Sequence, residues 1–279
     1  MSVFLRAVHY TDPGREREVN EDAAYSHLTQ PSDAEPTGLF IVADGMGGHA
    51  GGELASQEVV RTIAKELEGL FEVPDPRKTR KLAEAELAAE LSGQTATTKK
   101  LGGTRLTKMI EQAVIRANQV VLNTARHKPA EAGDAGSTVT MAVVRGNTAY
   151  IANVGDSRTY LLHNGELRQI TDDHSLVGKL LSAGQITAEE IYTHPQRNVI
   201  YRSLGNKPEV KVDVFERSLQ VGDRLLLCSD GLWEMVRDDE IARLLMMAPD
   251  PATACKRLIK VANQNGGEDN IGLVAVWIE

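Results

Sequence analysis

The stretch Val42-Ala43-Asp44-Gly45-Met46-Gly47-Gly48-His49 places a carboxylate, several glycines and a histidine directly after the short apolar run Leu39-Phe40-Ile41. The apolar run predicts a buried strand, and the four-residue spacing of apolar side chains over 53–67 predicts a helix beyond the glycines. Glycine lets the backbone turn tightly and approach a ligand. Asp44 and the unshielded Gly45 carbonyl suit a hard cation. Two other interpretations stay open for the stretch alone, a phosphate-cradling loop and a plain turn.

Composition narrows the class of protein. The chain has 279 residues, a formal net charge of −8 and two cysteines. This length is enough for one domain with a sizeable core. The acidic balance argues against a nucleic-acid binder, and two cysteines make no disulfide framework. No apolar run approaches the roughly 18 residues of a membrane span. We therefore expect a soluble, cytoplasmic monomer with neither a nucleic-acid nor a membrane partner.

The remaining periodicities predict both strands and helices. From residue 136 onward apolar residues recur at every second position, which predicts strands. The turn residues Gly146-Asn147 and His163-Asn164-Gly165 separate successive strands. The segment therefore predicts one continuous meander in an antiparallel sheet. The predicted strands are 3–10, 139–143, 149–154, 159–162, 167–170, 224–228 and 271–278, and the further predicted helices are 107–126, 239–247 and 251–263.

Two segments interrupt this pattern. Residues 68–106 are rich in alanine and glutamate after two prolines, which predicts a helical insertion rather than a second domain. Residues 174–202 are polar and jointed, which is typical of a flap beside a site or of an ordinary long loop. We expect residues 1–279 to form a single domain.

Three aspartates share one context. Asp44 and Asp230 each follow a strongly apolar strand and precede glycine, and Asp269 stands just before the last strand. Carboxylates that converge at strand ends would repel each other by several kcal/mol unless cations lay between them. Oxygen ligands alone favour Mg²⁺ or Mn²⁺ over Zn²⁺. Two ions clamped by shared carboxylates can activate water for attack on phosphorus.

Other polar residues have two interpretations each. The run 12–22 is either a charged surface loop or a segment in which Glu21 and Asp22 face a metal while Arg17 binds an anion through its planar fork. Asp156 either binds metal or caps the tight turn that contains it. Cys228 lies inside an apolar strand, which favours packing over nucleophilic chemistry.

Six motifs occur in one order along the chain. They are Arg17-x-x-Asn20-Glu21-Asp22, Asp44-Gly45-Met46-Gly47-Gly48-His49, Ala152-Asn153-Val154-Gly155-Asp156-Ser157-Arg158, Asp173-His174-Ser175, Cys228-Ser229-Asp230-Gly231-Leu232-Trp233 and Asp269-Asn270. In this set and order the chain resembles the metal-dependent serine/threonine protein phosphatases of type 2C, in their bacterial form, from about residue 6 to 278.

The resemblance implies an architecture and a set of metal ligands. The fold would be α/β, a four-layer α-β-β-α sandwich of two antiparallel sheets with helices on both outer faces. Two Mn²⁺ or Mg²⁺ ions would be bridged by Asp44, with the Gly45 carbonyl on the first ion and Asp230 and Asp269 on the second. Glu21 or Asp22 would act partly through water, and a third, looser ion would use Asp156 and Asp230. Asn198 would be a further ligand from the flap.

The resemblance also implies a reaction. Arg17 would hold the substrate phosphate, and His49 would protonate the leaving oxygen, a role that suits an unperturbed imidazole pKa. The substrates would be phosphoproteins, including serine/threonine kinases that the enzyme opposes. Two alternatives stay open: a non-catalytic binding or sensor module that keeps the fold, and a phosphatase restricted to an anti-sigma-factor antagonist. Among the other polar residues, His174 is expected to order its loop, and Arg158, Trp233 and Trp277 to be structural.

Overall fold

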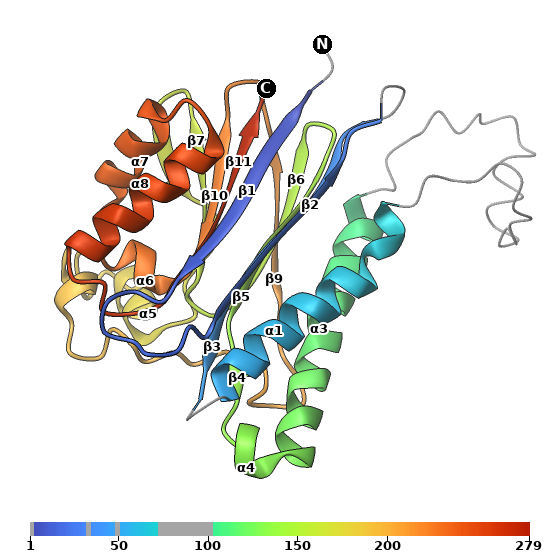
Figure 1. The fold of residues 1–279 in the computed structure, drawn as a ribbon, viewed down its shortest axis with the longest axis vertical. Helices are drawn as coiled ribbons and strands as arrows, with labels where there is room; N and C mark the ends of the chain where they lie inside the picture. The colour runs from blue at the N-terminus through green and yellow to red at the C-terminus, as the bar shows by residue number, and fades with distance from the viewer. Residues whose placement is uncertain (1–2, 32–34, 48–50, 72–102) are drawn as a thin grey trace, which may run out of the picture.

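Two antiparallel sheets pack face to face in the computed structural model, which describes residues 3–31, 35–47, 51–71 and 103–279 (Figure 1). Sheet A has the strand order β1-β11-β10-β7-β8, and sheet B has the order β2-β3-β5-β6-β9. The strands of sheet A are β1 (Leu5–Asp12), β11 (Ile271–Ile278), β10 (Arg224–Cys228), β7 (Arg158–His163) and β8 (Glu166–Gln169). Those of sheet B are β2 (Asp22–Thr29), β3 (Thr37–Met46), β5 (Val139–Arg145), β6 (Thr148–Val154) and β9 (Asp213–Ser218), with β4 (Gly136–Ser137) paired to the end of β3.

Helices cover both outer faces. In Figure 1, α1 (Gly51–Glu66) and α3 (Gly103–His127) lie over sheet B, while α7 (Asp238–Met247) and α8 (Pro251–Gln264) lie over sheet A. The shorter helices are η1 (Glu68–Leu70), α4 (Pro129–Ala132), α5 (Leu176–Ser182), η2 (Glu190–Thr193) and α6 (Asp230–Trp233). Among the described residues, no helix is both long enough and apolar enough to cross a membrane. The expected four-layer α-β-β-α sandwich is confirmed.

The central strands are continuously apolar because both of their faces are buried. In β3, Leu39 and Ile41 pack in the core beneath α1 and α3, whereas Phe40 and Val42 pack between the sheets. Side chains alternate along a strand, so a strand in the middle of four layers needs apolar residues at every position. The same reason explains the buried run of β10, where one set of side chains faces β3 and the other faces α7 and α8.

The predicted continuous meander is wrong at one point. β5 and β6 form a hairpin in sheet B, but β7 and β8 form a hairpin in sheet A, so the chain changes sheet between Val154 and Arg158. Gly155 makes the change at φ +112°, and a Cβ at this position would collide with the Thr138 side chain. Alternation of apolar and polar residues indicates that a segment is extended, but it does not indicate which strand the segment pairs with.

Three strands, β2, the two-residue β4 and β9, were not predicted from the sequence, and the bounds of two predicted segments differ in the structure. β2 and β9 carry few large apolar side chains, which hid them from the periodicity. Of the predicted insertion 68–106, the ends belong to η1 and α3, and residues 72–102 lie outside the described residues. The segment 174–202 contains α5 and η2, and its two ends meet where Leu176 N donates to Val199 O at 2.7 Å.

A buried ion pair lies beside the sheet crossover. Arg158 Nη2 donates to Asp173 Oδ2 at 2.7 Å, and both side chains are only 4% exposed. The guanidinium also lies 3.6 Å from the centre of the Trp233 ring. Removing one member of such a pair leaves a buried charge without its counterion, which is the costly change. This arrangement confirms the structural roles expected for Arg158 and Trp233.

We therefore predict that Asp173→Asn lowers the free energy of unfolding in urea by about 3–5 kcal/mol. The matched control is Glu166→Gln, which removes the acid of the exposed Arg168–Glu166 pair on β8 and should leave the urea midpoint unchanged. A loss below about 1 kcal/mol for Asp173→Asn would show that water reaches Arg158 and replaces the carboxylate.

Candidate functional site

Asp44 lies in β3 of sheet B, two residues before the strand ends at Met46, and both of its backbone groups are fixed by one residue. Asp44 N donates to Thr138 Oγ1 at 3.1 Å, and Thr138 N donates to Asp44 O at 2.8 Å. The next residue, Gly45, lies so close to the Gly52 carbonyl at the start of α1 that a Cβ would collide with it. Glycine at position 45 therefore allows β3 to pass close to the start of α1.

Asp22 lies directly across the β2–β3 ladder from Asp44 and is 8% exposed. Its Oδ2 accepts a hydrogen bond from Ser229 Oγ at 2.6 Å, while its Oδ1 is buried and has no hydrogen-bond partner. Burial raises the pKa of Asp22 to about 7, and the nearby charges of Asp269 and Glu21 add to the shift. A buried carboxylate oxygen without a donor is a position that a cation can satisfy.

Asp156 lies in the crossover between the sheets and is 4% exposed. Its carbonyl accepts a hydrogen bond from Trp233 Nε1 at 3.0 Å, and the neighbouring Ser157 Oγ lies 2.7 Å from Thr138 Oγ1. Thr138 therefore links the crossover to Asp44. Burial, followed by repulsion from Asp173, raises the pKa of Asp156 to about 7.

Asp230 and Asp269 come from the ends of β10 and β11 in sheet A. Asp230 is the first residue of α6, directly after β10, and Asp269 stands two residues before β11. Burial raises the pKa of Asp230 well above its ordinary value, and Asp156, Glu234, Asp269 and Asp22 raise it further. The pKa of Asp44 is also raised, by burial and then by Asp230, Asp22, Asp156 and Asp269. Five predicted carboxylates from both sheets therefore act on one another through a shared space.

A pocket of about 260 Å³ lies beside Asp230 and Asp269, between the loop that carries Arg17 and the segment 174–202. Arg17, Arg197, Asn198, Asp230 and Asp269 are among its lining residues. Arg17 Nη2 donates to Asp269 Oδ2 at 2.7 Å, and about half of the arginine side chain is exposed. Arg197 bonds Glu234 and Glu268 at 3.1 Å each, so it joins the segment 174–202 to the rim of the pocket. Arg17 and Asn198 thus lie beside two of the predicted metal ligands.

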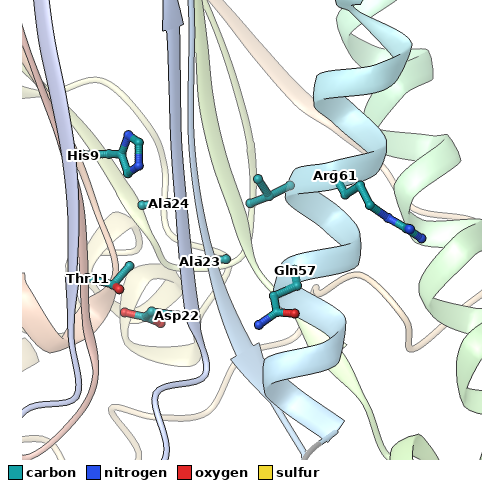
Figure 2. A pocket seen from close by; sticks show the side chains of 8 residues that line it. His9, Thr11, Asp22, Ala23, Ala24, Gln57 and Arg61 are labelled. Atoms are coloured by element: carbon teal, nitrogen blue, oxygen red, sulfur yellow. The ribbon is translucent and has the colours of Figure 1, made fainter.

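A second pocket, of about 390 Å³, lies between β1, β2 and α1. Figure 2 shows His9 and Thr11 from β1 on one side of β2 and Gln57 and Arg61 from α1 on the other, with Asp22 at its end. His9 Nδ1 lies 2.8 Å from Ser26 Oγ. Asp22 therefore borders space on the flank of the sandwich that is distinct from the pocket of Arg17.

The donor set fits hard divalent cations. Carboxylates are acceptor-only oxygen ligands, a cation among them would relieve the repulsion that raises their pKa values, and Asp22 Oδ1 has no other partner. Within the described residues, no three histidine, cysteine or acidic side chains form a compact ready-made cage. His49 lies outside the described residues.

His174 and Cys228, which were not expected to be catalytic, have the supporting roles predicted for them. His174 Nδ1 accepts a hydrogen bond from Gly155 N at 3.0 Å, so its other nitrogen bears the proton and donates to Asp213 Oδ2 at 3.2 Å. His174 therefore orders the crossover loop. Cys228 is fully buried, and burial raises the pKa of its thiol, which confirms a packing role.

Sequence reasoning missed the uncharged residues that hold the acids. Thr138, Ser229 and Asn270 make hydrogen bonds at the site. The charged residue that was also missed is Arg197, which joins the segment 174–202 to the rim of the pocket. Ser229 and Asn270 are direct neighbours of predicted ligands inside quoted motifs, which was an available signal. Nothing in the sequence around Thr138 indicates its contacts, because they depend on which strands are adjacent.

Comparisons with known proteins agree on one family. The family model described as protein phosphatase 2C matches residues 15–268. The serine/threonine phosphatase Stp of Listeria welshimeri is 37% identical over 272 residues, which cover 98% of this chain and 95% of the relative. The serine/threonine protein phosphatase PstP of Mycobacterium tuberculosis is 35% identical over 98% of this chain, which spans 45% of that relative.

Solved structures give the same result. The crystal structure of the M. tuberculosis phosphatase PstP/Ppp matches with a TM-score of 0.77 and 35% identity, covering 99% of each chain. A crystal structure of the PstP catalytic domain in complex with two manganese ions matches with a TM-score of 0.76 and 32% identity, over 99% of each chain. With its sandwich, its cluster of acids and these relatives in agreement, this chain belongs to the protein phosphatase 2C family, alongside the bacterial serine/threonine phosphatases.

Proposed function

We propose that this phosphatase hydrolyses phosphoserine and phosphothreonine on proteins with two Mn²⁺ or Mg²⁺ ions at the carboxylate cluster. Asp44, the Gly45 carbonyl, Asp230 and Asp269 would hold the two ions, with Asp22 and Glu21 acting through water. Asp156 and Asp230 would hold a third ion. The observation that carries the proposal is the convergence of five carboxylates, because burial and mutual repulsion raise the pKa values of four of them, Asp22, Asp44, Asp156 and Asp230. The two-manganese structure of the PstP catalytic domain supports the metal count.

The bound ions would supply Lewis-acid activation of a water molecule for attack on phosphorus. Arg17 would bind the phosphate from the side of the pocket, since its guanidinium is half exposed and already fixed at one end by Asp269. A planar guanidinium can donate two parallel hydrogen bonds to phosphate oxygens. His49, whose sequence position follows the Asp44 strand, would protonate the leaving serine or threonine oxygen.

The substrate would enter through the pocket beside the flap. We propose that residues 174–202 act as this flap, that Asn198 lies within reach of the third ion, and that residues 68–106 form an insertion in a single catalytic domain. The substrates would be phosphoproteins that include bacterial serine/threonine kinases, and the enzyme would act as a monomer. The pocket supports this assignment because flap residues and metal-side acids line it together.

The first prediction concerns the metal ligands. Asp230→Asn should lower Mn²⁺-dependent turnover of p-nitrophenyl phosphate and of a phosphothreonine peptide by at least about 100-fold, since it removes a charged ligand from two of the three proposed ion sites. Asp239→Asn on the exposed start of α7 is the control and should leave both rates unchanged. A folded wild-type protein that turns over neither substrate with Mn²⁺ or Mg²⁺ would instead support a binding module.

The second prediction concerns pH. Asp22 and Asp156 have folded-state pKa values of about 7 against an ordinary 3.8. Between these values the native state therefore binds more protons than the unfolded chain, and stability is lost as pH rises through 7. In EDTA, the Tm should fall between pH 5 and pH 8. Saturating Mn²⁺ should raise Tm more at pH 8 than at pH 6, because the metal competes with protons.

The control for this pH dependence is the pair of substitutions Asp22→Asn and Asp156→Asn in one protein. Because asparagine does not titrate, the fall of Tm with pH in EDTA should become shallower. An unchanged slope would place the responsible groups elsewhere in the molecule.

The third prediction separates substrate binding from metal binding. Arg17→Ala should raise KM for p-nitrophenyl phosphate by about tenfold, since a charge-assisted contact to phosphate is lost. The Mn²⁺ affinity measured by calorimetry should not fall, because the substitution removes a positive charge next to Asp269. Arg15→Ala, in the same exposed loop, is the control for charge. A weaker Mn²⁺ affinity with an unchanged KM would assign Arg17 to metal support instead.

A further inference from the structure

Asn270 uses its whole side-chain amide to bind a loop about 250 positions away in the sequence. Its Oδ1 accepts a hydrogen bond from Glu21 N at 2.8 Å, and its Nδ2 donates to Pro13 O at 2.9 Å and to Val19 O at 3.0 Å. The residue is 5% exposed. One amide therefore holds the start and the end of the loop 13–21, which carries Arg17 at its centre.

The loop is attached to the same segment by further contacts. Arg15 N and Glu16 N donate to Gly267 O at 2.8 and 3.3 Å, and Asn263 Nδ2 donates to Asp12 Oδ1 at 3.0 Å. Arg17 itself donates to the Glu268 carbonyl at 3.4 Å and to the Asp269 carboxylate at 2.7 Å. The segment 263–270 thus serves as the platform on which the loop lies.

The three partners of Asn270 require an amide. Two are carbonyl oxygens, which need N–H donors, and the third is a backbone N–H, which needs an acceptor. Among side chains of this size, aspartate offers no donor and an apolar residue offers neither. The partners therefore fix the orientation of the amide as well as its identity.

We infer that Asn270 is a positioning residue for phosphate binding, which sets the Arg17 guanidinium over the metal side of the pocket. This inference rests on the proposed role of Arg17. Its neighbour Asp269 is a proposed metal ligand and the ion-pair partner of Arg17, so two consecutive residues fix the anion-binding side chain relative to the ions. Asn270 touches neither substrate nor metal in this scheme and acts only through the loop.

The test compares Asn270→Ala, which removes all three hydrogen bonds, with Asn270→Asp, which retains the acceptor alone. The matched control is Asn265→Ala in the same segment, because Asn265 bonds only the Met235 carbonyl and does not touch the loop. Each variant is first shown to be folded by its circular dichroism and thermal transition. If Asn270→Ala does not fold, the test proceeds with Asn270→Asp.

The first readout, hydrogen–deuterium exchange of peptides covering 13–21, does not depend on activity. Exchange in these peptides should accelerate by about tenfold or more in Asn270→Ala and stay unchanged in Asn265→Ala, because the amide shields the Glu21 N–H and anchors both ends of the loop. Unchanged exchange in a folded Asn270 variant would overturn the inference. This readout remains valid if the wild type shows no phosphatase activity, an outcome that would instead contradict the proposed function.

The second readout is kinetic. Asn270 variants should raise KM for p-nitrophenyl phosphate and the inhibition constant of inorganic phosphate by about tenfold each, with kcat and Mn²⁺ affinity changed less than threefold. In an Arg17→Ala background the same substitutions should have almost no further effect on either constant, because the residue that they misplace is absent. The inference would be overturned if an Asn270 substitution and Arg17→Ala raised KM and the inhibition constant independently, or if the Asn270 substitution mainly lowered kcat or Mn²⁺ affinity. Asn270 would then be a structural or metal-supporting residue.

Discussion

Mutual repulsion among buried and half-buried carboxylates is the constraint on which the rest of this structure depends. Asp22, Asp44, Asp156 and Asp230 all have raised pKa values, with burial as the largest cause and neighbouring acids adding to it. The native fold holds these groups together although burying neighbouring carboxylates costs free energy. Three apolar cores, one between the sheets and one beneath each helical layer, provide the compensating burial. Such a conflict between local stability and chemistry is typical of functional sites.

The supporting contacts position the acids while leaving most of their negative charge available. Uncharged groups make these contacts. Thr138 Oγ1 accepts a hydrogen bond from Asp44 N and lies within hydrogen-bond distance of Ser157 Oγ, Ser229 donates to the Asp22 carboxylate, and the Trp233 indole donates to the Asp156 carbonyl. The arginines of the site region are paired mainly with other acids, Arg158 with Asp173 and Arg197 with Glu234 and Glu268. Arg17 is paired with Asp269, at the exposed rim. The result is a negative interior with a positive side chain at its entrance, which suits cations inside and a phosphate at the mouth.

The architecture explains why chain segments so distant in sequence cooperate. Sheet A contributes Asp230 and Asp269, sheet B contributes Asp22 and Asp44, and the crossover between them contributes Asp156. Because the sheets pack face to face, a small rotation of one against the other would change the distances among all five acids. Links between the sheets, such as Ser229 to Asp22 and Thr138 to Ser157, therefore define the site as much as the ligands do. The fold that brings these segments together matches the PstP/Ppp crystal structure with a TM-score of 0.77 at 35% identity.

The amino-acid sequence by itself determined the local elements and the chemical type of the site. The continuous apolar runs of β3 and β10, the period-two segments and the amphipathic helices follow from burial patterns that side-chain order encodes directly. The aspartates proposed to bind metal could be predicted because each stands next to glycine or at a strand end. The resemblance to one family of phosphatases then assigned them to a common site.

Only the tertiary structure decided which elements meet. The change of sheet at Gly155, the unnoticed strands β2 and β9, and the contacts of Thr138 and Asn270 all depend on pairings between residues distant in sequence. A hydroxyl or an amide in the sequence does not indicate its partner, because hydrogen bonds are local in space and the chain brings distant segments together only when it folds.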